Sequence, residues 1–113
     1  MRENLLIVIS SASKESILKF PLLYSGVSIP RGYWKRVHIM FWGESIQTVA
    51  QEIDVQKKIK EVLETGVEFS SCIVCCQEYG VVETFKELHI EVNHTGELLT
   101  KALKSDQWAT MTI

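Results

Sequence analysis

Short apolar runs alternate with segments of helical periodicity along the whole chain, and this alternation restricts the possible folds more than any other feature. Leu5–Ile9 is a continuous apolar run, as expected for a strand that is covered on both faces. Ile46, Val49, Ala50 and Ile53 instead recur at the spacing of one helix face. Because two parallel strands need a crossover connection, the alternation predicts an α/β fold with a parallel sheet and helices on both of its faces.

The pattern predicts five strands, over residues 5–9, 37–42, 67–74, 89–92 and 108–113. A first helix is expected after Ser13, with an interruption at Pro21. Two further helices are expected over 46–53 and from Asp54 to Gly66. A helical turn at 77–80, a short helix at 82–88 and a last helix at 98–103 complete the pattern. Loops are expected at 26–32 and 93–96. With 113 residues and no repeat or linker, we expect a single domain, residues 1–113, of three-layer α/β/α, flavodoxin-like topology.

Composition excludes several classes of protein. The chain is 46% hydrophobic and 23% charged with a net charge of −2, which is ordinary globular usage and argues against disorder and against nucleic-acid binding. No stretch approaches the roughly 20 apolar residues of a membrane span, so no membrane partner is expected. The three cysteines lie within five residues of one another and cannot cross-link distant segments, which favours a reducing compartment and predicts a cytoplasmic protein.

Polar and sulfur-containing residues follow the predicted strands at their carboxyl ends, where open parallel sheets bind ligands. The cysteine cluster ends the third strand, and His94 lies in the loop after the fourth. We therefore expect chemistry at Cys72, Cys75 and His94, in a pocket lined by the residues around them: Ser11, Gly43, Cys76, Asn93 and Thr95.

Cys72 is the strongest of these candidates. It lies where the third strand ends and a helix is expected to begin. The free N–H groups of a helix N-terminus stabilise a thiolate. A thiolate is required by a persulfide carrier, a redox couple or an acyl acceptor. The competing interpretation is that cysteines are small buried hydrophobes, and it applies more strongly to Cys75 and Cys76. His94 is either a proton donor to this thiol or an exposed loop histidine without a role.

Signatures of bound cofactors are absent. There is no phosphate-binding Gly-x-x-x-x-Gly-Lys motif and no dinucleotide-binding Gly-x-Gly-x-x-Gly turn, and the hydroxyl-rich loop 10–13 contains no glycine. A zinc site needs four ligands, and no second Cys/His pair accompanies the cysteine cluster. We expect neither a cofactor nor a metal.

Several short motifs resemble one known family. They are Trp42-Gly43 at the end of the second strand, Glu64-Thr65-Gly66-Val67 before the third, a cysteine at 72 followed eight positions later by Gly80, and Gly96-Glu97-Leu98-Leu99 before the last helix. Together, and over essentially the whole chain, they resemble the DsrE/DsrF-like (TusD-like) sulfur-relay proteins. One departure concerns Glu78-Tyr79, because members that match this role commonly carry a basic residue just before the glycine.

The resemblance implies a parallel sheet in the order 4-3-2-1-5 and assembly into homo-trimers or hexamers. It also implies that Cys72 accepts sulfane sulfur as a persulfide from a donor protein and passes it to an acceptor protein. With that sheet order, Asn93 and His94 lie near Cys72. The departure at Glu78-Tyr79 weakens the transfer of any particular partner or substrate to this chain.

Three hypotheses follow, and the sequence leaves open whether the protein is an enzyme. The first is a sulfur carrier with Cys72 as persulfide acceptor, Cys75 as candidate resolving thiol and His94 as candidate proton donor. The alternative is a non-catalytic module of the same fold that binds a small ligand or a protein. The third is a redox switch that forms a Cys72–Cys75 disulfide.

Overall fold

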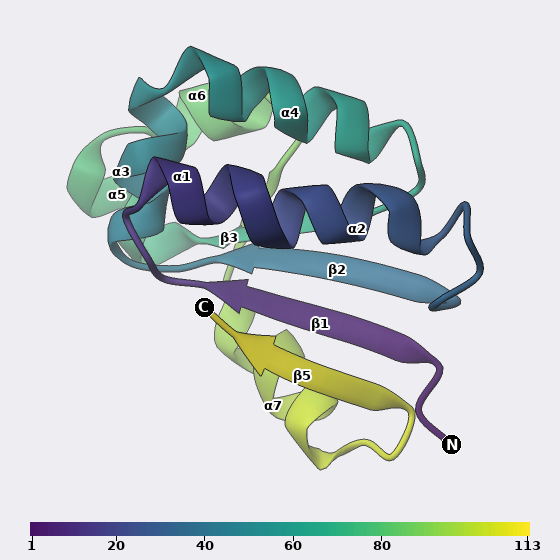
Figure 1. Cartoon of the computed structure of the whole chain (residues 1–113). Helices are drawn as coiled ribbons and strands as arrows, with labels where there is room; N and C mark the ends of the chain where they lie inside the picture. The colour runs from purple at the N-terminus through teal and green to yellow at the C-terminus, as the bar shows by residue number, and fades with distance from the viewer.

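A five-stranded parallel sheet forms the centre of the computed structural model, which describes residues 1–113. Its order is β4-β3-β2-β1-β5 (Figure 1). The strands are β1 (Asn4–Ile9), β2 (Arg36–Phe41), β3 (Glu68–Cys72), β4 (Glu91–Asn93) and β5 (Trp108–Thr112). All four neighbouring pairs are parallel, so the predicted fold class and the sheet order implied by the family resemblance are both confirmed.

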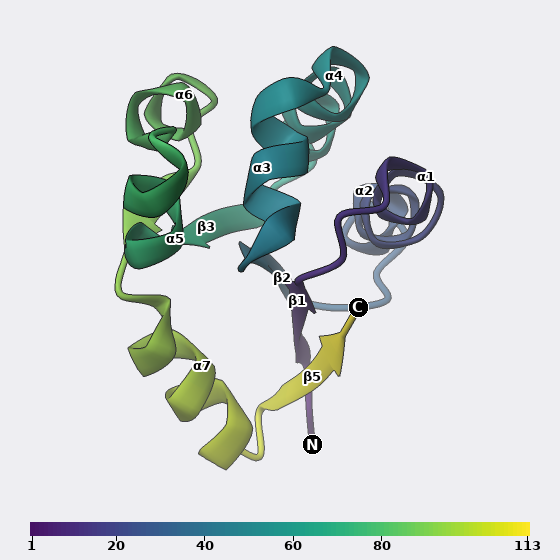
Figure 2. The ribbon, with the colours of Figure 1, turned by 90° about the vertical axis from the view of Figure 1, so that its left-hand side faces the viewer.

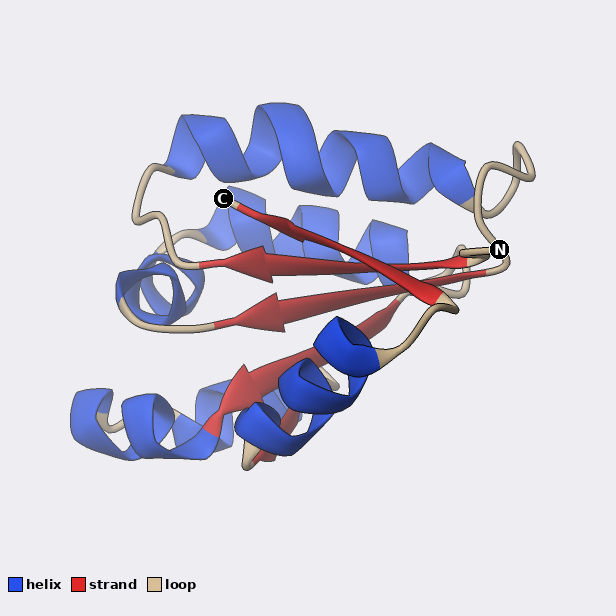
Figure 3. Ribbon diagram, turned by 90° about the horizontal axis from the view of Figure 1, so that it is seen from below, coloured by secondary structure: helices blue, strands red, loops and turns tan.

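Helices cover the two faces of the sheet unequally (Figure 2). One face carries α1 (Lys14–Ile17), the π-helical segment η1 (Leu18–Leu22), α2 (Leu23–Ser28), α3 (Glu44–Gln51), α4 (Ile53–Leu63), α5 (Ile73–Tyr79) and α6 (Val82–Glu87). The other face carries only α7 (Thr95–Lys104), which lies in front of the strands in Figure 3. The chain steps in one direction from β1 to β4 and then returns to β5, and right-handed crossovers put the return helix on the opposite face.

The hydrophobic core is divided in the same way. Twenty buried residues form the larger cluster, in which Phe41 stacks on Phe69 with ring centroids 6.1 Å apart and meets Phe85 edge-on at 6.3 Å. The cluster beneath α7 contains only four buried residues: Leu6, Val8, Met40 and Ala102. Alternate residues of β1 serve opposite faces, which explains why that strand is a continuous apolar run.

The first helical segment is longer and less interrupted than expected. Ser13 caps α1 by accepting a hydrogen bond from the Ser16 backbone N–H, as predicted. At Pro21 the helix widens into the π-helical segment and continues, with Pro21 buried. The prediction that a loop begins at Gly26 is wrong, because α2 continues to Ser28. A Cβ at Gly26 would lie 3.4 Å from a Val62 methyl group, which is an ordinary van der Waals contact between α2 and α4.

Three other boundaries differ from the prediction. β3 ends at Cys72, and Ile73 and Val74 begin α5 although their β-branched side chains favour a strand. β4 begins only at Glu91, because His89 adopts a φ of 61° and turns the chain. Glu52 rather than Asp54 is the N-cap of α4.

The last helix also starts earlier than expected. α7 begins at Thr95, within the segment predicted to be a loop, and its N-cap is His94. Thr95 and Gly96 are therefore helical, and this places the first turn of α7 at the carboxyl ends of β3 and β4. None of the helices in the structure combines the length and the apolar character that crossing a membrane requires.

Candidate functional site

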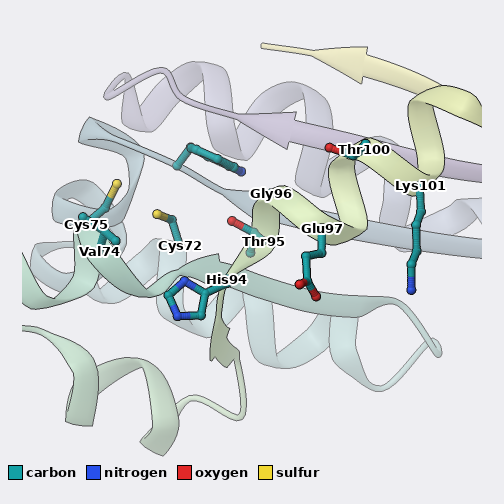
Figure 4. Close-up of a pocket in the computed structure, with 10 residues that line it drawn as sticks. Cys72, Val74, Cys75, His94, Thr95, Gly96, Glu97, Thr100 and Lys101 are labelled. Atoms are coloured by element: carbon teal, nitrogen blue, oxygen red, sulfur yellow. The ribbon is translucent and has the colours of Figure 1, made fainter.

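The largest pocket lies at the carboxyl ends of β2 and β3, beside the N-terminus of α7, and has a volume of about 960 Å³ (Figure 4). Trp42, which follows β2, contributes to one wall, and Cys72 comes from the end of β3. Val74 and Cys75 come from α5, and the remaining lining residues belong to the segment from His94 to Lys101. Cys72, Cys75, His94 and Thr95 are thus brought together from segments distant in sequence.

Cys72 is placed by the β3–β4 pairing and by the helix that follows it. It is the N-cap of α5 and is the Cα partner of Asn93. Only 8% of the residue is exposed, so its thiol is reached through the pocket. The residue that follows Asn93 is His94, which is why the order of the sheet brings this histidine to the pocket that Cys72 lines.

Cys75 lies one helical turn after Cys72, and the two thiols are close enough for Cys72 to influence the pKa of Cys75. The sulfurs of both side chains are visible at the same end of the pocket in Figure 4. Burial raises the pKa of the Cys75 thiol, and the neighbouring Cys72 raises it further. The nearby backbone N–H of Gly43 acts in the opposite direction and lowers the pKa of this thiol.

Cys76 does not line the pocket, contrary to the expectation. It is fully buried in the larger core and donates a hydrogen bond to Ser71 Oγ at a sulfur–oxygen distance of 3.6 Å. Burial raises the pKa of this thiol as well. Successive residues of a helix point about 100° apart, so Cys75 and Cys76 face different environments.

His94 and Thr95 line the pocket from the start of α7, but they differ in exposure. His94 is exposed and its side chain makes no capping bond, whereas Thr95 is 1% exposed. Asn93 lies outside the lining, where its side-chain amide donates to Glu91 Oε2 at 3.2 Å. Together with His94 it borders a second, smaller pocket of about 420 Å³.

Gly43 and Ser11 are not lining residues of this pocket. Gly43 instead supplies the backbone N–H that meets Cys75, in a conformation with φ 58° and ψ −137°. Ser11 lies beyond the end of β1, where its hydroxyl accepts from the Ser13 N–H at 3.1 Å. The intervening strand β2 separates that loop from β3.

Sequence reasoning missed the contribution of α7. Glu97, Thr100 and Lys101 line the pocket at helical spacing from His94. That spacing is a usable signal only once the helix is known to start at Thr95. The sequence favours a core position for Trp42, and the structure places it both against the core and in the pocket wall.

The neighbouring thiols of Cys72 and Cys75 at the end of the pocket are the chemical centre of this site. No group of three or more His, Cys, Asp or Glu side chains is arranged to hold a metal ion. The arrangement can form a persulfide on one thiol and can join the two thiols in a disulfide.

Known proteins share this architecture. Residues 3–110 match the model of the DsrE/DsrF-like family. A solved structure of a conserved protein of unknown function from Bacteroides thetaiotaomicron, BT1422, is 32% identical, with a TM-score of 0.93 over 98% of this chain and 95% of that one. The ychN protein from E. coli is 12% identical with a TM-score of 0.67 over 100% of both chains, and this likeness concerns the fold alone. No match was found among the curated proteins.

Proposed function

The chain belongs to the DsrE/DsrF-like family, and on that premise we propose that it carries sulfane sulfur as a persulfide on Cys72 and passes it to a partner protein. The observation that carries the proposal is the position of Cys72. Cys72 lines the largest pocket from the end of β3, and Cys75 lines the same pocket beside it. A carrier needs a cysteine that is accessible to a donor yet sheltered from bulk solvent, and a pocket thiol in a residue only 8% exposed meets both needs.

The proposed reaction is a thiol–persulfide exchange. The Cys72 thiolate attacks the outer sulfur of a donor persulfide, a new sulfur–sulfur bond forms at Cys72, and the donor leaves as a thiolate. His94, exposed at the pocket rim, donates a proton to that leaving thiolate. Handover to the acceptor repeats the same exchange, with the acceptor thiolate attacking the outer sulfur held on Cys72.

The proposal includes the setting of the protein. Donor and acceptor are proteins with reactive thiols, and three free cysteines are suited to the reducing cytoplasm. A homo-trimer or hexamer is the proposed assembly, in which neighbouring subunits enclose the open side of the pocket. Light scattering of the purified chain measures the assembly state directly.

Intact-mass spectrometry after incubation with a persulfide donor tests the carrier function. We expect the wild-type chain to gain the mass of one sulfur atom and Cys72→Ala to gain none. Cys76→Ala is the matched control, because it removes the same atoms from a buried cysteine outside the pocket and should keep the adduct. Failure of the wild-type chain to gain sulfur from any donor would contradict the proposal.

A second candidate function is a non-catalytic module that binds a small ligand or a protein. The burial of Cys72 and the raised pKa of Cys75 favour it, because both features slow thiol chemistry at neutral pH. Iodoacetamide labelling at pH 7 separates the two functions. Slow alkylation of Cys72 supports the module, and rapid alkylation supports the carrier.

A further inference from the structure

Two hydrogen-bond donors in the pocket have no partner. The hydroxyl oxygen of Thr95 and the indole nitrogen of Trp42 are both buried, and neither makes a hydrogen bond within the chain. Both residues line the pocket, and Thr95 is 1% exposed. Buried polar groups are nearly always paired because leaving them unpaired is costly, so two unpaired donors in one pocket wall indicate a missing hydrogen-bond acceptor.

The start of α7 adds further donors at the same place. α7 is ten residues long, and its N-cap, His94, provides no side-chain bond to the free N–H groups of the first turn. The N-terminal end of such a helix also carries partial positive charge. In Figure 4 the Thr95 hydroxyl points toward Cys72. An acceptor bound there would therefore lie between the helix N-terminus and the thiol.

Two charged side chains of α7, Glu97 and Lys101, also line the pocket. Glu97 and Lys101, one turn apart on α7, project together from the same side of the helix, whereas the Thr95 hydroxyl points toward the cysteines (Figure 4). Glu97 belongs to the first turn and competes with a bound anion for its positive field. The donor that points toward the thiol is thus the uncharged Thr95 hydroxyl, and the uncharged Trp42 indole lines the same pocket.

We infer that the pocket recognises an anionic group, a carboxylate or a sulfur oxyanion, on a small molecule that delivers sulfur to Cys72 in place of a donor protein. The Thr95 hydroxyl and the Trp42 indole N–H donate to that group at the N-terminus of α7. This inference rests on the proposed carrier function and adds a small-molecule donor to the donor proteins proposed above. It also gives the unpaired donors of the pocket their partner.

Thiosulfate illustrates the chemistry, because its anionic SO3 group is bonded directly to the sulfane sulfur that is transferred. The Cys72 thiolate attacks the sulfane sulfur and forms a sulfur–sulfur bond, the sulfur–sulfur bond of thiosulfate breaks, and sulfite leaves with the electron pair. Cys72 retains a deprotonated persulfide, and no oxidant or reductant is consumed. Hydrogen bonds from Thr95 and Trp42 stabilise the negative charge on the departing oxyanion.

Binding is measured without any sulfur transfer by titrating sodium sulfite into ¹⁵N-labelled Cys72→Ala protein and recording its indole N–H resonances. We expect the Trp42 resonance to shift and to saturate. Trp34 is the internal control, because its indole nitrogen already donates to the Tyr24 hydroxyl at 2.9 Å. Equal, unsaturating shifts of both resonances would overturn the inference.

Thr95→Val tests the hydroxyl, since valine has nearly the same shape and removes an unpaired buried group. We expect it to fold with unchanged or higher stability and to lose about tenfold in the rate of persulfide formation from thiosulfate or glutathione persulfide. Benzyl hydropersulfide, which has no anionic group, should react at a rate unchanged by the substitution. Thr112→Val makes the same change at an exposed residue of β5 outside the pocket and should leave all rates unchanged.

The outcomes separate the two ideas. Equal rates for Thr95→Val and wild type with every donor would overturn anion recognition while leaving Cys72 as a carrier. Absence of a Cys72 adduct from any donor, together with a saturating Trp42 shift, would overturn the carrier and leave an anion-binding pocket. A rate loss confined to glutathione persulfide identifies a carboxylate as the recognised group, and one confined to thiosulfate identifies a sulfur oxyanion.

Discussion

Cys72 and Asn93 are direct partners in the parallel register of β3 and β4. This pairing places the residue after Asn93, His94, at the rim of the pocket that Cys72 lines, although the two are far apart in the chain. It also sets where α7 begins, and therefore where Thr95 lies relative to the thiols. The chemistry of the site thus depends on a short edge strand of three residues.

Cys75 is expected to limit the lifetime of the persulfide. Its thiol is a neighbour of the Cys72 thiol in the same pocket, so its thiolate can attack the Cys72 sulfur, form a Cys72–Cys75 disulfide and release hydrosulfide. Because burial raises the pKa of Cys75, this resolution should be slow at pH 7 and faster as pH rises. Cys75→Ser should keep the persulfide several-fold longer at pH 9, as followed by intact mass and by release of sulfide.

Thiol counting checks the same pair under mild oxidation. Loss of two thiols without dimerisation is the expected result for wild type, and Cys75→Ser should lose none by this route. If the persulfide decays equally fast in both proteins, Cys75 is not the resolving thiol.

Gly43→Ala should destabilise the fold and disturb Cys75. At φ 58° and ψ −137° only glycine is unstrained, so we expect a loss of about 1–3 kcal/mol in the free energy of unfolding, measured with urea. The movement of the Gly43 N–H should also slow alkylation of Cys75, because that N–H favours the thiolate. Gly96→Ala is the control: Gly96 lies in α7, where an added Cβ would meet no atom within 4 Å, and its substitution should not destabilise.

His38 should make stability depend on pH. It is 5% exposed, with Nδ1 3.2 Å from Glu68 Oε1 and Nε2 2.7 Å from Ser70 Oγ. Burial lowers the pKa of His38 and outweighs the opposing influence of Glu68, so the folded state favours the neutral ring. The unfolded chain takes up this proton near pH 6.5, and the free energy of unfolding should therefore fall below that pH by at most about 1.4 kcal/mol per pH unit.

A second decrease is expected at lower pH from Glu68. The hydrogen bond from Arg36 is the main reason that the pKa of Glu68 is lowered. The stabilisation of the fold by ionised Glu68 is therefore present at pH values above the ordinary pKa of a carboxyl group and is lost on acidification. Urea unfolding at pH 7.5 and 5.5 isolates the histidine. His38→Gln should flatten the dependence in that interval, and the exposed His94→Gln should preserve it; an equal slope in all three proteins would exclude His38.

Local patterns predict the elements of this fold well where packing agrees with propensity. The apolar run of β1, the Ser13 cap and the glycine stop at Gly80 all appear as expected, because each depends on neighbours in sequence. The side chains of Ile73 and Val74 favour a strand, but β3 ends at Cys72 and both residues begin α5 instead. Cys76 adjoins Cys75 in sequence, which suggests a place on the rim, but helix geometry turns it into the core.

By itself, the sequence determined the α/β class, the order of strands and helices, and the cysteine cluster at the end of β3, since hydrophobic periodicity is a local property. The tertiary structure alone decided which of these residues meet. Sheet order and register put α7 on the sheet face opposite the other helices and bring Thr95 and Trp42 into the pocket of Cys72. Contacts between segments this far apart arise from packing of the whole sheet, which the pattern within any one element does not encode.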